Sequence, residues 1–185
     1  MIYLIRHAKK LDNSVDSKLS KEGLQNSFTY GKNLQVNNIK IDLIISSPME
    51  RCLQTAKEIV KGYEKNIKIE KSNLLGDPGI FVNNGDSAMK IFNKYKLVDI
   101  INMQLSGKEL DGFSRIDTAT QKLLLFMKNN QDNVLYISHD AIITPLVHFI
   151  GNINNIEEND IVDYLCGYSN FHKYLTKPWM INKLI

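Results

Sequence analysis

IYLIRH, residues 2–7, begins with four apolar residues and ends with an arginine and a histidine. The apolar part is short, unbroken and rich in β-branched and aromatic side chains, which is typical of a strand buried on both faces. Such strands belong to largely parallel sheets, where ligands bind beyond the carboxyl ends of the strands. The stretch therefore predicts a central strand that presents Arg6 and His7 at a binding edge.

Two other predicted strands also end in polar side chains. Residues 42–45 (DLII) stop at an SSP turn, and Arg51 follows one turn into the next predicted helix. Residues 133–137 (NVLYI) form the clearest strand pattern in the chain and stop at Ser-His-Asp, which includes His139. Because the carboxyl ends of parallel strands meet at one edge, we expect these side chains to gather there.

Helical patterns separate the strands. Strands that alternate with helices indicate an α/β fold, and we predict a three-layer sandwich with a mostly parallel central sheet and helices on both faces. The other predicted elements are a helix from the N-cap Ser20 to Leu34, a helix that starts at Pro48, a short strand at 67–69, a helix at 116–127, and a buried helix at 142–150 with Gly151 at its C′ position.

The regular alternation breaks at GDPG, residues 76–79, which is a strong turn signal. The segment from about 80 to 113 is mixed and helix-like. We therefore predict one domain over 1–185, with a small helical lid inserted at 77–113. In the tail we expect strands around 162–165 and 170–175.

The composition excludes several classes of protein. The chain has 185 residues, 43% of them hydrophobic and 23% charged, which fits a folded soluble domain. A net charge of +3 is too small to indicate nucleic acid, and no segment has the features of a signal peptide or a membrane span. Cys52 and Cys166 lie in no Cys/His cluster, so no zinc site is predicted, and reduced thiols suit a cytoplasmic protein.

The polar residues at the predicted edge match what phosphoryl transfer requires. A neutral histidine can attack phosphorus and form a covalent intermediate, which fits His7. Arginine forks match two phosphate oxygens at once, which fits Arg6 and Arg51. A second, protonated histidine can offset charge in the transition state, which fits His139, and Lys10 is a further positive donor. Arg6 and His7 alone could simply end a strand with a salt bridge. The inference of a phosphate site therefore depends on Arg51 and His139 being present as well.

Four motifs in this order resemble one known family. They are RHA at 6–8, LSKEG at 19–23, SSPMERCLQTA at 46–56 and SHD at 138–140. They are similar to the RHG/RHA signature, the Leu-Thr-x-x-Gly helix start, the Ser-Ser-Pro-x-x-Arg-x-x-Gln-Thr-Ala motif and the second histidine of the histidine phosphatase superfamily, the phosphoglycerate mutase-like proteins. The resemblance spans roughly residues 1–150.

The resemblance implies a role for each residue. His7 would carry the phosphoryl group, and Arg6, Arg51 and His139 would complete the phosphate pocket. Lys10 stands where acid-phosphatase-like members have a second arginine. No metal or organic cofactor is expected.

The general acid has two candidates. Acid-phosphatase-like members use an aspartate directly after the second histidine, which Asp140 matches. Mutase-like members place a carboxylate in the loop after the third strand, and Asp77 lies near that place. Asp140 is the favoured candidate, and either aspartate would need a raised pKa to hold its proton.

The predicted function is a metal-independent phosphatase that hydrolyses phosphate monoesters through a phosphohistidine on His7. Its partner would be a small phosphorylated metabolite or a phosphoprotein, with no nucleic acid and no membrane, and the oligomeric state stays open. Alternatives are a non-catalytic phospho-ligand binder, a phosphohistidine-protein phosphatase and, less favoured because a Ser-x-Trp-Asn stretch is missing, a phosphoglycerate mutase. We expect Ile80, Phe81 and Phe92 to form an apolar wall, and Ser46 and Ser47 to end the strand and cap the helix.

Overall fold

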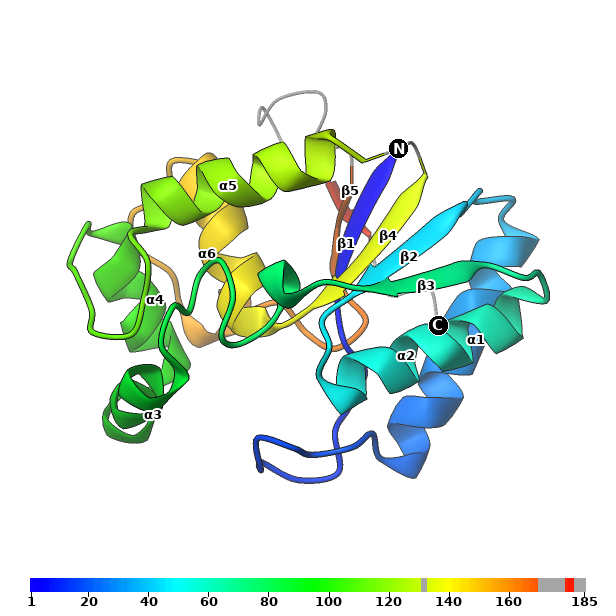
Figure 1. The fold of residues 1–185 in the computed structure, drawn as a ribbon, viewed down its shortest axis with the longest axis horizontal. Coiled ribbons are helices and arrows are strands. Elements are labelled where there is room, and N and C mark those ends of the chain that lie inside the picture. The colour runs from blue at the N-terminus through cyan, green and yellow to red at the C-terminus, as the bar shows by residue number, and fades with distance from the viewer. Residues whose placement is uncertain (131–132, 170–178, 182–185) are drawn as a thin grey trace.

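A computed structural model describes residues 1–130, 133–169 and 179–181. Its centre is a six-stranded sheet in the order β3-β2-β4-β1-β5-β6 (Figure 1). The four strands β3, β2, β4 and β1 run parallel, and β5 is antiparallel to both of its neighbours, so the predicted mostly parallel sheet is confirmed. The strands are β1 (Ile2–Arg6), β2 (Leu43–Ser46), β3 (Lys68–Lys71), β4 (Val134–Ser138), β5 (Gly167–Ser169) and β6 (Trp179–Ile181).

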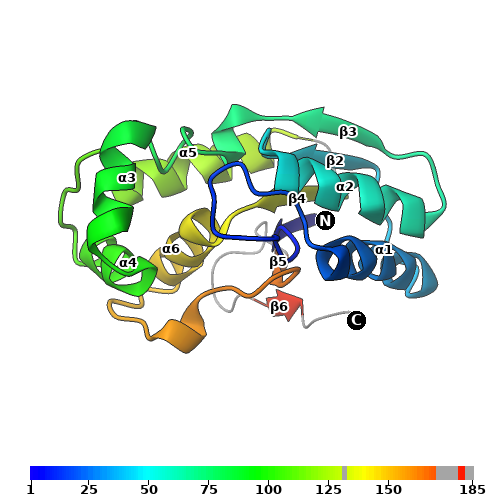
Figure 2. The ribbon, with the colours of Figure 1, turned by 90° about the horizontal axis from the view of Figure 1, so that it is seen from below.

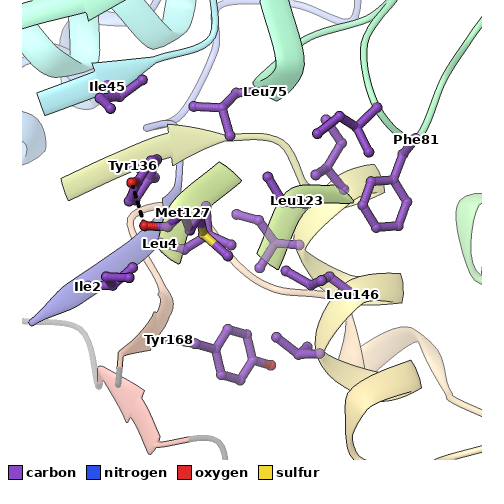
Figure 3. Close-up of a cluster of buried hydrophobic side chains, with 14 of the residues drawn as sticks. Ile2, Leu4, Ile45, Leu75, Phe81, Leu123, Met127, Tyr136, Leu146 and Tyr168 are labelled. Atoms are coloured by element: carbon purple, nitrogen blue, oxygen red, sulfur yellow. Dashed lines mark hydrogen bonds between the residues drawn. The ribbon is translucent and has the colours of Figure 1, made fainter. Parts of the chain in front are cut away.

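Helices cover both faces of this sheet, which confirms the predicted three layers (Figures 1 and 2). One face carries α1 (Lys21–Val36) and α2 (Glu50–Tyr63), and the other carries α5 (Ile116–Lys128) and α6 (Asp140–Ile150). The side-chain alternation of β1 explains why both faces need a cover. Ile2 and Leu4 pack under α5 and α6 (Figure 3), while Tyr3 and Ile5 pack under α1 and α2.

The helix pair α1 and α2 packs closely because glycines remove side chains at the contact. A Cβ on Gly31 would lie 2.0 Å from the carbonyl oxygen of Ile59, and one on Gly62 would lie 1.9 Å from that of Phe28. Ser20 caps α1 as predicted, since its side chain accepts a hydrogen bond from the N–H of Gly23.

The parallel register brings the strand ends level with one another. Arg6 and Ser46, the last residues of β1 and β2, pair with Ser138 and Ile137, the last two residues of β4. The ladder continues one step further, because the N–H of His7 donates to Ser138 and the N–H of Ser47 donates to Ile137. The residues that follow β1, β2 and β4 therefore lie at one edge of the sheet.

The inserted segment is helical, as predicted, and consists of α3 (Gly85–Lys94) and α4 (Leu97–Leu105). It has a small core of its own around Val82, Ile100 and Phe113. It is also attached to the main body, because α4 packs against α6 and the side-chain amide of Asn102 exchanges two hydrogen bonds with the backbone of Ile156. Two short 3₁₀ helices, η1 (Asn73–Leu75) and η2 (Glu158–Asp160), complete the described elements.

The tail differs from the prediction. Residues 162–165 form no strand, and the antiparallel strand lies at Gly167–Ser169 instead. Leu165 adopts a left-handed conformation with φ 57°, which interrupts an extended chain, and the N–H of Val162 donates to the Thr144 side chain. The predicted strand at 170–175 lies outside the described residues.

The end of α6 also differs. Gly151 is the C-cap with φ −75°, and Asn152 takes the left-handed conformation with φ 54°. Asparagine tolerates this conformation because its short polar side chain lowers the steric cost. No helix in the described part of the chain is long and apolar enough to cross a membrane.

Candidate active site

His7 lies directly after β1, with 3% of its surface exposed. Its Nδ1 is 2.7 Å from the carbonyl oxygen of Ala8, which can only accept, so Nδ1 carries the proton. Nε2 then has a lone pair and accepts a hydrogen bond from Nε of Arg51 at 3.1 Å. Burial lowers the pKa of His7 to about 3, and the positive charge of Arg51 acts in the same direction. The imidazole is therefore neutral at physiological pH.

Arg51 connects the two histidines of the site. It stands in the first turn of α2, after the SSP turn that ends β2. While Nε donates to His7, Nη2 lies 3.2 Å from Nδ1 of His139, and Nη1 donates to the carbonyl of Val15 at 2.6 Å. The guanidinium thus reaches three segments that are distant in the sequence.

His139 follows β4 and is buried at the start of α6. Since its Nδ1 faces the Arg51 donor, Nε2 carries the proton and donates to the hydroxyl of Ser47 at 2.9 Å. Its ring lies edge-on to that of His7, with centroids 5.3 Å apart. Burial, followed by the charges of His7 and Arg51, lowers the pKa of His139 well below its usual range. Without a ligand His139 is neutral, in contrast to the protonated form expected from the sequence, and a phosphate dianion would oppose that shift.

Arg6 and Asp140 form an ion pair beside the histidines. Nη2 of Arg6 lies 2.6 Å from Oδ2 of Asp140, and Nη1 donates to the carbonyl of Val162 at 2.8 Å. The ring of Tyr164 lies against the guanidinium, with its centroid 4.1 Å from Cζ. Asp140 also accepts a hydrogen bond from the N–H of Ala141 through Oδ1. Both oxygens of Asp140 therefore have donors.

Asp77 has a different environment. It follows η1 in the GDPG turn, and its Oδ1 is buried and receives no hydrogen bond from any described residue. Burial raises the pKa of Asp77 above its ordinary value, against the opposing attraction of Arg51. A carboxyl group in this setting holds a proton more readily than one that is paired.

A hollow of about 330 Å³ lies at this edge of the sheet, between the loop that follows β1 and the helix α3. Figure 2 shows that loop running between α3 and α2. The hollow brings together five of the seven residues predicted from the sequence, namely Lys10, Arg51, Asp77, His139 and Asp140. Burial lowers the pKa of Lys10.

The other two predicted residues border this hollow without lining it. His7 lies behind Arg51, which covers its Nε2. Arg6 lines an adjoining hollow of about 470 Å³ and shares Asp140 with the first.

Three polar residues of the site were not among the site residues predicted from the sequence, namely Ser47, Thr55 and Tyr164. Ser47 does not cap α2 as predicted, because its weak hydrogen bond comes from the N–H of Met49, the N-cap residue, and the helix has no side-chain cap; Ser47 instead holds His139. Thr55 joins two parts of the site, since Oγ1 accepts from the N–H of Ala8 and donates to the carbonyl of Arg51. The QTA motif was a signal for Thr55, whereas nothing in the sequence pointed to Tyr164.

The predicted apolar wall is right for one residue of three. Phe92 lines the hollow, but Ile80 and Phe81 belong to the main core under α5 and α6 (Figure 3). The sequence does not separate these two outcomes, because an apolar residue after a turn has the same local pattern whether it faces a lid or the core.

Comparison with known proteins finds a family match for the first part of the chain. A model of the histidine phosphatase superfamily (branch 1) matches residues 2–76, which include the RHA and SSPMERCLQTA motifs. This part of the chain is therefore similar to that superfamily. None of the curated proteins matches the sequence of this chain significantly.

Solved structures share the fold of this chain over most of its length. Phosphoserine phosphatase from Entamoeba histolytica, in complex with 3-phosphoglyceric acid, is 19% identical with a TM-score of 0.61, covering 100% of this chain and 98% of that chain. A mycobacterial glucosyl-3-phosphoglycerate phosphatase is 15% identical with a TM-score of 0.56, covering 83% and 81%. The protein histidine phosphatase SixA, complexed with tungstate, is 18% identical with a TM-score of 0.51, covering 80% and 74%.

Proposed function

We propose that this protein hydrolyses phosphate monoesters through a covalent phosphohistidine on His7. The observation that carries the proposal is the state of His7. Its Nδ1 proton is held by the carbonyl of Ala8, so the lone pair on Nε2 faces Arg51 in a site that keeps the ring neutral. A neutral, oriented imidazole is a competent nucleophile toward phosphorus.

The reaction follows from these contacts. The phosphate oxygens replace His7 and His139 as acceptors for Arg51, and Lys10 adds a positive charge. Nε2 of His7 attacks phosphorus as the P–O bond to the alcohol breaks, and Asp77 gives its proton to the leaving oxygen. Water then attacks phosphorus, the N–P bond breaks, and the Asp77 carboxylate takes the proton of the water.

We assign the general acid to Asp77 in preference to Asp140. Asp140 is bound to Arg6 at 2.6 Å and accepts a hydrogen bond from the N–H of Ala141, so both of its oxygens are already engaged by donors. The unpaired, buried Oδ1 of Asp77 and its raised pKa suit an acid. Asp140 then serves as a positioning residue that orients Arg6.

The inserted segment supports a small substrate. We propose that the chain is one domain over 1–185, in which 77–113 is a lid. Val82, Met89, Phe92 and Leu97 from this segment form one side of the hollow. A hollow of about 330 Å³ is near the lower end of small-molecule sites, so a metabolite is favoured over a phosphoprotein.

The test compares wild type with His7→Ala and His7→Asn. Wild type should hydrolyse phenyl phosphate, and both variants should lose turnover while keeping the circular dichroism of the folded protein. Rapid quenching with ³²P-labelled substrate should trap an acid-labile, base-stable label on wild type alone. Binding of inorganic phosphate by a wild-type protein that hydrolyses no phosphomonoester would instead support the non-catalytic binder. Metal independence is tested by turnover after exhaustive dialysis against a chelator.

A further inference from the structure

We infer that the site takes phosphate esters whose leaving group is uncharged and largely apolar, and that it discriminates against leaving groups that carry a carboxylate. This inference rests on the proposed phosphatase function. It concerns the part of the hollow that faces away from His7.

The inserted segment contributes four apolar side chains to the lining of the hollow, beside the polar Asp77 and Asn93. Phe92 and Leu97 are half-buried there, and Val82 is buried. Met89 faces the same hollow although 36% of it is exposed, and Val15, on the loop after β1, is 50% exposed. Apolar side chains left open to water around a hollow gain free energy when an apolar ligand group covers them.

The positive charges in the lining come from other elements, the loop after β1 and the helix α2. Among the described residues that line the hollow, the cationic side chains are Lys10 and Arg51, and both act on the pKa of His7. A phosphate bound at His7 occupies these two cations. A second anionic group would find no further cation in the described lining.

Lysines do occur on the inserted segment, but they do not line the hollow. Lys94 lies over the ring of Tyr95, at 5.1 Å from its centroid, and Lys96 pairs with Glu158 at 3.3 Å. Lys90 is exposed on α3 and is absent from the lining.

Carboxylates in the lining act against an acidic leaving group. Asp140 forms an ion pair with Arg6, and Asp77 becomes charged once it has given up its proton. A substrate carboxylate near either group would meet like charge in a partly buried site, which disfavours binding. Asn13 and Asn93, which also line the hollow, can still bond to neutral polar groups.

The experiment measures kcat/KM for benzyl phosphate, ethyl phosphate, phosphoserine and 3-phosphoglycerate. Benzyl and ethyl alcohols are leaving groups of similar acidity, so their comparison isolates the apolar contact. We expect benzyl phosphate to exceed each of the other three by about 10-fold or more, the range in which apolar pockets discriminate. Phosphoserine or 3-phosphoglycerate as the equal or better substrate would overturn the inference.

Substitutions in α3 test which side chains cause the preference for benzyl phosphate. Met89→Lys and Phe92→Lys should lower kcat/KM for benzyl phosphate and raise it for 3-phosphoglycerate, which reverses the preference. Lys90→Met, next to Met89 but outside the lining, is the matched control and should change neither value. Unchanged ratios in both lysine variants would also overturn the inference.

Failure of the proposed phosphatase function can be distinguished from failure of this inference about the leaving group. If no ester is hydrolysed, phosphatase activity is excluded, and calorimetric binding of the same four esters still measures the preference. Equal affinities for benzyl phosphate and 3-phosphoglycerate would then overturn the inference independently.

Discussion

Nε of Arg51 lies 3.1 Å from Nε2 of His7, so the guanidinium covers the ring nitrogen that we propose as the nucleophile. The same guanidinium bonds His139 and the carbonyl of Val15. In the proposed reaction, an incoming phosphate takes these donors for itself before His7 reacts. On that proposal, Arg51 links substrate binding to exposure of the nucleophile.

Removing Arg51 should change both catalysis and the titration of His7. In Arg51→Gln, kcat/KM for phenyl phosphate should fall about 100-fold or more, as expected for loss of a donor to the transition state. The pKa of His7 should rise, because a nearby positive charge that lowers it is gone. Steady-state kinetics and NMR titration of the imidazole measure the two effects.

Two further variants make this test specific. Arg51→Lys should restore little activity, because an ammonium group cannot donate to both histidines as a planar fork does. Arg115→Gln, an exposed residue that pairs with Asp117, should behave as wild type. An unchanged pKa of His7 in Arg51→Gln would contradict the electrostatic explanation.

The choice of general acid predicts a dependence on the leaving group. Asp77→Asn should reduce kcat for ethyl phosphate by about 100-fold or more, the usual range for loss of acid catalysis. It should reduce kcat for 4-nitrophenyl phosphate far less, because nitrophenolate leaves without a proton. The ratio of the two kcat values is the measurement.

Asp140→Asn is the matched comparison. Because Asp140 orients Arg6, its loss should impair both substrates by a similar factor. Rate ratios that change in Asp140→Asn and stay constant in Asp77→Asn would reverse the assignment.

Acid should destabilise the fold through His7. The pKa of His7 is about 3 in the folded protein and near its ordinary 6.5 when unfolded, so between these values the unfolded chain binds the additional proton. This stabilising contribution is complete above pH 6.5 and is lost as the pH falls toward 3. Between pH 7.5 and 5.0 the free energy of unfolding should decrease by about 2 kcal/mol. Urea titration at each pH measures this decrease. In His7→Asn the decrease over the same interval should be smaller, and an equal decrease would argue against a buried neutral His7.

The packing of α1 on α2 should not tolerate a methyl group at Gly62. Its Cβ would lie 1.9 Å from the carbonyl oxygen of Phe28, and backbone cannot yield easily between two packed helices. Gly62→Ala should therefore lower the free energy of unfolding by about 2–3 kcal/mol. Gly85→Ala is the control, since the nearest atom to its Cβ is at 3.6 Å, and it should be neutral or slightly stabilising. Thermal and urea unfolding compare the two variants.

Much of the framework follows from local sequence. The unbroken apolar run at 2–5 and the pattern at 133–137 are sufficient to predict two buried strands of a largely parallel sheet, because side chains buried on both faces leave a strong signal. That the two strands are neighbours is seen only in the structure. The motifs that follow those strands then predict which polar side chains share an edge. A helical insertion was also predictable, from the turn signal that precedes it.

Other features depend on segments far apart in the chain. Whether Ile80 and Phe81 face a substrate or the core depends on where α5 and α6 pack, which no local pattern records. Residues 162–165 look extended, but Leu165 turns left-handed where the chain passes Arg6.

The two aspartates illustrate the difference most clearly. Residue type and spacing name Asp77 and Asp140 as candidates, because a carboxyl group near the second histidine or after the third strand is visible in the sequence. Their surroundings depend instead on burial and on partners supplied by remote segments. Arg6, from the opposite end of the chain, pairs with Asp140, while the fold buries an oxygen of Asp77 without a described donor and raises the pKa of that carboxyl. Because the fold assembles these surroundings, tertiary structure distinguishes the two residues where sequence could not.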